Sequence, residues 1–82
     1  VLHSEESIEE SYLLKELLAE VDQIIQTLPE KFEVPLILFY LSDCSIEQIA
    51  AIIRKPPGTV KSRLFKGRSL IKKRLEDAGY EK

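Results

Sequence analysis

The sequence predicts an all-α fold, a four-helix domain that ends in a helix-turn-helix. Two observations lead to this prediction. Apolar residues recur at spacings of three and four in segments separated by capping patterns and prolines, and the one apolar run that could form a strand has no second strand to pair with. Of the 82 residues, 44% are apolar and 32% are charged, which is typical of one small globular domain.

The first helix is predicted to run from Ser7 to about Thr27. Ser7 and Glu10 have the spacing of a capping box, in which the serine hydroxyl accepts an early backbone N–H and the glutamate reaches back. The apolar residues that follow form one stripe, made of Leu14, Leu17, Leu18, Val21, Ile24, Ile25 and Leu28. This spacing indicates an amphipathic helix with that stripe against the core.

A second helix is predicted to begin at Pro29. A proline suits the first turn of a helix because its missing N–H has no partner there, and Glu30 favours the positive end of the helix dipole. Residues 34–41 are apolar on nearly every side, so we expect this helix to be the buried centre of the domain. Pro35 falls later than the first turn, and it should cost one backbone hydrogen bond or introduce a small kink.

The third and fourth helices are predicted to form the helix-turn-helix. Residues 42–44 make a turn, and a second capping box from Ser45 to Gln48 opens a helix of about two turns. Residues 54–56 interrupt that helix, and the fourth helix then extends from Pro57 to about Asp77. A short helix, a tight turn and a long cationic helix are typical of this motif.

Composition excludes several classes of function. A chain of this length buries only about 60% of its unfolded surface, too little for a deep substrate cavity, so we do not expect an enzyme. Cys44 is the only cysteine and His3 the only histidine, so no disulfide, zinc site or other cofactor is expected. No apolar run approaches the roughly 18 to 20 residues that span a bilayer. The first ten residues are acidic, unlike a signal peptide, and we expect a cytoplasmic protein.

The chain has no methionine and starts at Val1, so we expect it to be a piece of a longer protein. Within it we assign residues 1–10 to an acidic tail or linker remnant, residues 11–78 to the helix-turn-helix domain and residues 79–82 to a C-terminal tail.

Charge is strongly segregated along the chain, although the net charge is only −2. Residues 1–53 contain eleven acidic and two basic residues, whereas residues 54–75 contain nine basic residues and no acid. A polyanion meets a local surface and not the average charge of a protein. The cationic segment is therefore a candidate surface for nucleic acid.

The fourth helix separates into two faces when its residues are placed about 100° apart. One sector is apolar and should face the core; it holds Val60, Leu64, Gly67, Ile71 and Leu75. The opposite face holds Ser62, Phe65, Lys66, Ser69 and Lys73, flanked by Lys61 and Lys72. Phe65 is the unusual member of this polar face. It either folds back over a neighbouring alkyl chain or contacts thymine methyl groups in a major groove, and its lysine and serine neighbours favour the second interpretation.

The order of these residues resembles the C-terminal region 4 of bacterial RNA polymerase sigma factors, closest to the extracytoplasmic-function class. The resemblance covers about residues 12–76. It rests on Leu28-Pro29-Glu30-Lys31, on Ser45-Ile46-Glu47-Gln48-Ile49-Ala50, and most specifically on residues 58–68, Gly-Thr-Val-Lys-Ser-Arg-Leu-Phe-Lys-Gly-Arg. One departure is Pro56, which stands where a serine would cap the recognition helix better.

The resemblance implies that the last helix enters the major groove of the −35 promoter element. It also implies that another face docks on the β-subunit flap of RNA polymerase, and that an anti-sigma factor holds the protein silent. The family's base-contacting positions map onto Lys61, Ser62, Phe65 and Lys66, on the outer face of the helical wheel. Region 2, which melts the promoter in family members, is absent, so we expect this piece to bind DNA without initiating transcription. We also expect it to be a monomer.

Further cations and a hydroxyl are candidate phosphate contacts. Arg54, Lys55 and Thr59 lie at the turn and at the N-terminus of the fourth helix, where backbone N–H groups attract phosphate. Lys72 and Lys73 lie two turns further on, where they should touch only phosphate. Arg63 and Arg68 border the apolar stripe; we include them, although they could instead cover apolar neighbours or pair with acids of the first two helices.

Two alternative functions remain open at this stage. The output domain of a response regulator is also a four-helix unit with a Thr-Val-Lys stretch at its recognition helix, but such domains usually dimerise on tandem half-sites. A helical protein-interaction domain would leave the nine cations as a solvated face, and it would not bind DNA even at low salt.

Overall fold

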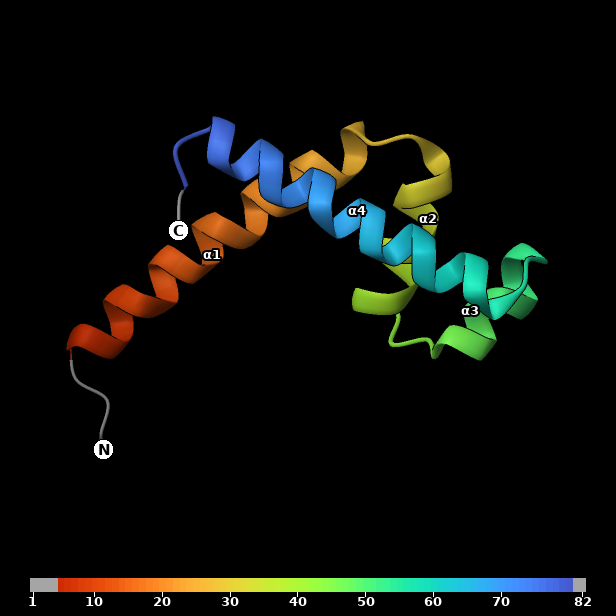
Figure 1. The fold of residues 1–82 in the computed structure, drawn as a ribbon. Helices are drawn as coiled ribbons and strands as arrows, with labels where there is room; N and C mark the ends of the chain where they lie inside the picture. The colour runs from red at the N-terminus through yellow and green to blue at the C-terminus, as the bar shows by residue number, and fades with distance from the viewer. Residues whose placement is uncertain (1–4, 81–82) are drawn as a thin grey trace.

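The computed structural model describes residues 5–80, which form four helices and no strand (Figure 1). The helices are α1 (Glu5–Thr27), α2 (Glu30–Tyr40), α3 (Ile46–Ile53) and α4 (Pro57–Asp77). The all-α prediction is confirmed, and so is the C-terminal helix-turn-helix formed by α3 and α4.

Two helix starts differ slightly from the sequence predictions. Helix α1 begins at Glu5 instead of Ser7, in a run of acidic residues that the positive end of a helix dipole favours. Pro29 is the N-cap of α2 and not its first helical residue. Its extended backbone lets its carbonyl accept hydrogen bonds from the N–H groups of Phe32 and Glu33, at 2.9 and 3.0 Å. The role predicted for Pro29 was therefore wrong by one residue.

The second capping box is confirmed at the start of α3. The Ser45 hydroxyl accepts a hydrogen bond from the Gln48 N–H at 3.0 Å, and the Gln48 side chain accepts the Ser45 N–H at 2.8 Å. Helix α4 begins at Pro57, as predicted, although its N-cap, Pro56, supplies no side-chain hydrogen bond. The fixed φ of Pro57 favours the first helical turn in place of a side-chain cap.

The core lies where α2 crosses α3 and α4. Leu36 of α2, Ile49 of α3 and Val60 of α4 have no exposed surface, and Leu64 is 2% exposed. A Cβ atom added to Gly67 would lie 2.8 Å from Cδ1 of Leu36. Helices α2 and α4 therefore approach closely at a glycine, as the inward position of Gly67 in the wheel predicts.

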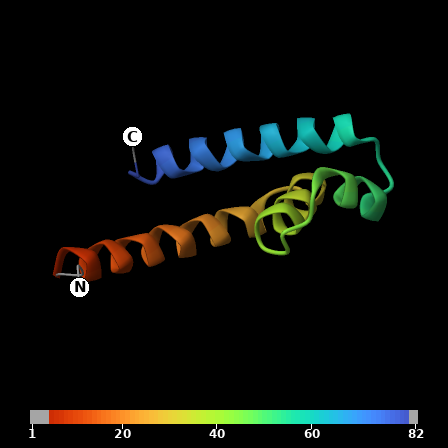
Figure 2. The ribbon, with the colours of Figure 1, turned by 90° about the horizontal axis from the view of Figure 1, so that it is seen from below.

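The apolar stripe predicted along α1 is only half covered. Ile24, Ile25 and Leu28 are buried, whereas Leu14 and Leu18 are each more than half exposed. Figures 1 and 2 show that the N-terminal turns of α1 extend beyond the C-terminal end of α4. The expectation that the whole stripe faces the core was therefore wrong for Leu14 and Leu18.

Within residues 5–80, no helix is both long and apolar enough to span a membrane. Helix α1 has the length, with 23 residues, but acidic residues recur along it.

Candidate nucleic-acid interface

A tight turn at residues 54–56 sets the direction of α4 relative to α3. Arg54 is the C-cap of α3 and adopts the left-handed conformation, with φ 60° and ψ 47°. The N–H groups of Arg54 and Lys55 both donate to the carbonyl of Ala50, which satisfies the end of α3. Helix α4 begins at Pro57, so only three residues separate it from the end of α3.

The outward face of α4 carries the side chains predicted to contact bases. Lys61, Ser62, Phe65 and Lys66 are all exposed. Phe65 is 69% exposed, so its ring lies outside the core, as its position on the polar face of the helical wheel predicts.

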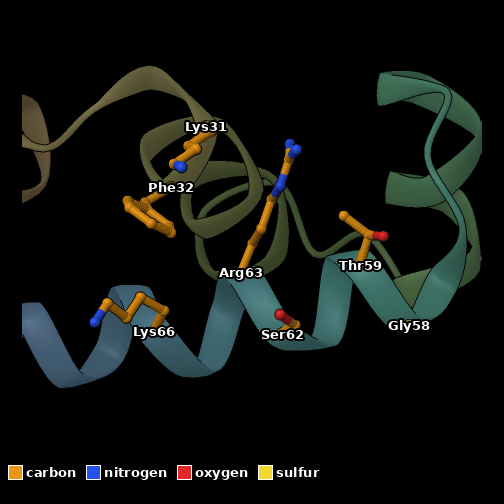
Figure 3. Close-up of a pocket in the computed structure, with 7 residues that line it drawn as sticks. All are labelled: Lys31, Phe32, Gly58, Thr59, Ser62, Arg63 and Lys66. Atoms are coloured by element: carbon orange, nitrogen blue, oxygen red, sulfur yellow. The ribbon is translucent and has the colours of Figure 1, made fainter.

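A hollow of about 480 Å³ lies beside this face, between α4 and the start of α2. Figure 3 shows Lys31 and Phe32 of α2 opposite α4, with Arg63 reaching from α4 towards α2. The hollow is lined by three cations, two hydroxyl-bearing side chains, one aromatic ring and a glycine, namely Lys31, Arg63, Lys66, Thr59, Ser62, Phe32 and Gly58. It has no acidic side chain in its lining, so it suits an anion.

The Lys31 side chain is oriented by its own neighbour. Its Nζ lies 5.2 Å from the centre of the Phe32 ring, within the range of a cation–π contact. Lys31 belongs to the acidic half of the chain and lies 28 residues before Thr59, so the charge pattern of the sequence does not assign it to the cationic segment. Its place in the Leu28-to-Lys31 motif, at the first turn of α2, was the one available signal.

The remaining predicted phosphate contacts divide into free and engaged side chains. Arg54, Lys55, Lys72 and Lys73 are exposed, while Thr59 and Arg63 are half-buried at the edge of the hollow. Arg68 is exposed and donates a hydrogen bond of 2.6 Å to the hydroxyl of Tyr40, at the end of α2. Arg68 thus bonds the phenol of Tyr40 instead of an acidic side chain, which was one of the partners considered for it. Tyr40 was not among the functional residues predicted from the sequence.

A second arginine of α4 is engaged in the same way near the C-terminal end of the helix. Arg74 donates a hydrogen bond of 2.5 Å to the hydroxyl of Thr27, which itself donates to the carbonyl of Ile24. Thr27 closes α1, so this contact joins the last turn of α4 to the end of α1. Arg74 thus contributes to packing between helices, a role distinct from that of the exposed Lys72 and Lys73.

The fold and this surface define a helix-turn-helix domain whose last helix presents cations, hydroxyls and one aromatic ring to solvent. A model of the family described as Sigma-70, region 4, matches residues 18–71. The chain belongs to this family, which confirms the resemblance inferred from the sequence. It is thus a sigma-factor domain of transcription initiation and not an enzyme.

Similar proteins support the same assignment and its extracytoplasmic-function (ECF) class. The ECF RNA polymerase sigma factor SigW of Bacillus subtilis is 35% identical over 69 residues, which cover 84% of this chain and 37% of that protein. The RNA polymerase sigma-H factor of Pseudomonas aeruginosa is 42% identical over 71 residues, covering 87% and 37%. The ECF RNA polymerase sigma-E factor of Escherichia coli K12 is 39% identical over 64 residues, covering 78% and 34%. The chain therefore spans little more than a third of the length of these relatives.

Proposed function

We propose that this domain recognises the −35 element of a promoter by placing the N-terminal half of α4 in the major groove. The observation that carries the proposal is the exposed ring of Phe65, flanked by Lys61, Ser62 and Lys66. A major groove offers thymine methyl groups to an apolar side chain and guanine acceptors to lysine. In helix-turn-helix proteins, the N-terminal residues of the second helix are the ones that reach base edges.

Phosphate contacts on both sides of α4 fix the domain on the duplex. The hollow beside α2 adds Lys31 to the cations of α4 and collects positive charge along one flank of the recognition helix. Contacts of this kind set orientation and affinity without reading sequence, whereas the outward face of α4 supplies specificity.

The whole factor would also dock on the β-subunit flap of RNA polymerase and be held silent by an anti-sigma factor, acting as a monomer in the cytoplasm. Exposed apolar side chains outside the DNA face support a docking role, because an interface needs apolar area that a free monomer rarely displays. They include Leu14 and Leu18 of α1, Ile52 of α3 and Leu41 after α2. A partner that covers α4 would exclude DNA by mass action.

The test is selection of DNA by the 82-residue chain from duplexes randomised over one helical turn. We expect recovery of a short consensus that contains thymine and guanine, and binding to it that is stronger than binding to a scrambled duplex of the same composition. Recovery of no consensus, with equal affinity for both duplexes, would refute base recognition. A response-regulator output domain would instead select paired half-sites and bind them as a dimer, which the mass of the complex reports.

A further inference from the structure

We infer that Tyr40 is a positioning residue, which holds the guanidinium of Arg68 ready for a backbone phosphate of the bound DNA. The inference rests on the proposed function and extends it to a residue of α2, outside the helix-turn-helix. It starts from one contact between helices, the hydrogen bond of 2.6 Å from Arg68 to the Tyr40 hydroxyl.

Arg68 lies on the flank of α4 that faces away from the hollow. Lys61, Phe65 and Lys72 are seven, three and four residues from it, so all four side chains project from neighbouring positions of one flank. The residues of α4 that line the hollow project from the other side of the helix; they include Thr59, Ser62, Arg63 and Lys66. When a helix lies in a major groove, the two DNA backbones run along its two sides. Arg68 is therefore placed towards one strand, and the hollow towards the other.

The Tyr40 ring has a packing partner of its own. It packs edge-on against Phe39, with ring centres 4.9 Å apart and an angle of 81° between the planes. Phe39 is half-buried and packs against the core, so the phenol extends from a rigid base. Tyr40 is 49% exposed, and its hydroxyl meets Arg68 at the rim of the domain.

The hydrogen bond leaves most of the guanidinium free. Arginine carries five N–H donors, and the bond to Tyr40 is made by Nη1. An arginine on a long flexible chain loses rotamer freedom when a phosphate immobilises it, and this loss lowers affinity. Because Tyr40 restricts the Arg68 side chain in the free protein, much of that loss is already incurred on folding. Binding is then stronger than it would be with an unrestrained arginine.

The experiment compares Tyr40→Phe, Arg68→Ala and the double variant on the selected consensus duplex and on its scrambled form, across a range of salt. Arg68→Ala should weaken binding to both duplexes and reduce the magnitude of the salt slope by about one unit. Tyr40→Phe keeps the aromatic ring and leaves the charge of Arg68 in place. It should therefore weaken binding about three- to tenfold with an unchanged salt slope. In the Arg68→Ala background, the same substitution should change affinity by less than about twofold.

The Thr27–Arg74 contact supplies a matched control. It is also a hydrogen bond from an arginine of α4 to a hydroxyl of another helix, but it lies in the last turn of α4. Thr27→Val should leave DNA affinity and salt slope unchanged, and thermal melting should show that each variant is folded. Equal effects of Tyr40→Phe in both backgrounds, or no effect of either substitution while the wild type binds, would overturn the role of Tyr40 and leave the proposed function standing. Absence of binding by the wild type would overturn both.

Discussion

Arg54 holds a backbone conformation that is unfavourable for an arginine. Its φ of 60° lies in the left-handed region, which costs about 1–2 kcal/mol for a residue with a Cβ atom. Glycine is the usual residue at such a helix end. The position therefore keeps an arginine on a strained backbone directly before α4, which is expected if that side chain contacts DNA.

Arg54→Gly should raise the free energy of unfolding by about 0.5–1 kcal/mol, because relief of the strain exceeds the entropy that glycine loses on folding. The same substitution should weaken binding to both consensus and scrambled DNA and reduce the magnitude of the salt slope by about one unit. Asp43, with φ 57°, is the matched control in the other turn. Asp43→Gly should also stabilise the fold, but it should leave the salt slope unchanged. A loss of stability in Arg54→Gly would contradict the strain argument.

A substitution at Phe65 tests whether sequence-specific binding can be separated from general attraction to DNA. Phe65→Ala should cost about 1–3 kcal/mol of binding free energy on the consensus duplex, the size of one good base contact, and little on scrambled DNA. Its melting temperature should be unchanged, because the ring is 69% exposed. Lys73→Ala is the control, since it should weaken binding to both duplexes alike. Equal losses on both duplexes in Phe65→Ala would show that the ring does not read sequence.

At the scale of the helices, α2 and α4 approach each other closely at Gly67. A methyl group there would lie 2.8 Å from Cδ1 and 3.3 Å from Cγ of Leu36, which has no exposed surface and so little room to move. Gly67→Ala should lower the free energy of unfolding by about 1–2 kcal/mol, since the clash outweighs the helix propensity of alanine. Gly58, in the same helix, has no atom within 4 Å of an added Cβ. Gly58→Ala should be neutral or slightly stabilising in chemical denaturation, and a similar result for Gly67→Ala would contradict the close crossing.

The elements differ in how far sequence alone predicted them. The bounds of α3 and α4 followed from local chemistry, because a serine–glutamine capping box and Pro57 act within one turn of the helix they start. The coverage of α1 did not, because Leu14 and Leu18 have the correct periodicity, but their burial depends on how the other helices pack against α1. The Tyr40–Arg68 contact joins residues 28 positions apart, a distance at which no pattern of spacing indicates pairing.

At the scale of the whole molecule, folding brings cations that are far apart in the sequence onto one surface. The outward face of α4 was predictable, because helical periodicity alone separates Lys61, Ser62, Phe65 and Lys66 from the apolar stripe. The hollow beside it was not predictable, because Lys31 comes from the acidic half of the chain and meets α4 only through the packing of α2. A count of cations in residues 54–75 therefore underestimates the cationic surface.

The salt dependence of binding measures that surface directly. If about four to six cations meet phosphate, the logarithm of the binding constant should fall against the logarithm of salt concentration with a slope of about −4 to −5. Lys31→Ala should reduce the magnitude of the slope by about one unit, because its ammonium lines the hollow with Arg63 and Lys66. Lys15→Ala removes the same charge from an exposed position on α1 and should leave the slope unchanged. Equal slopes for the two variants would show that Lys31 does not contact the DNA. A slope near zero for the wild type would contradict the electrostatic account of binding as a whole.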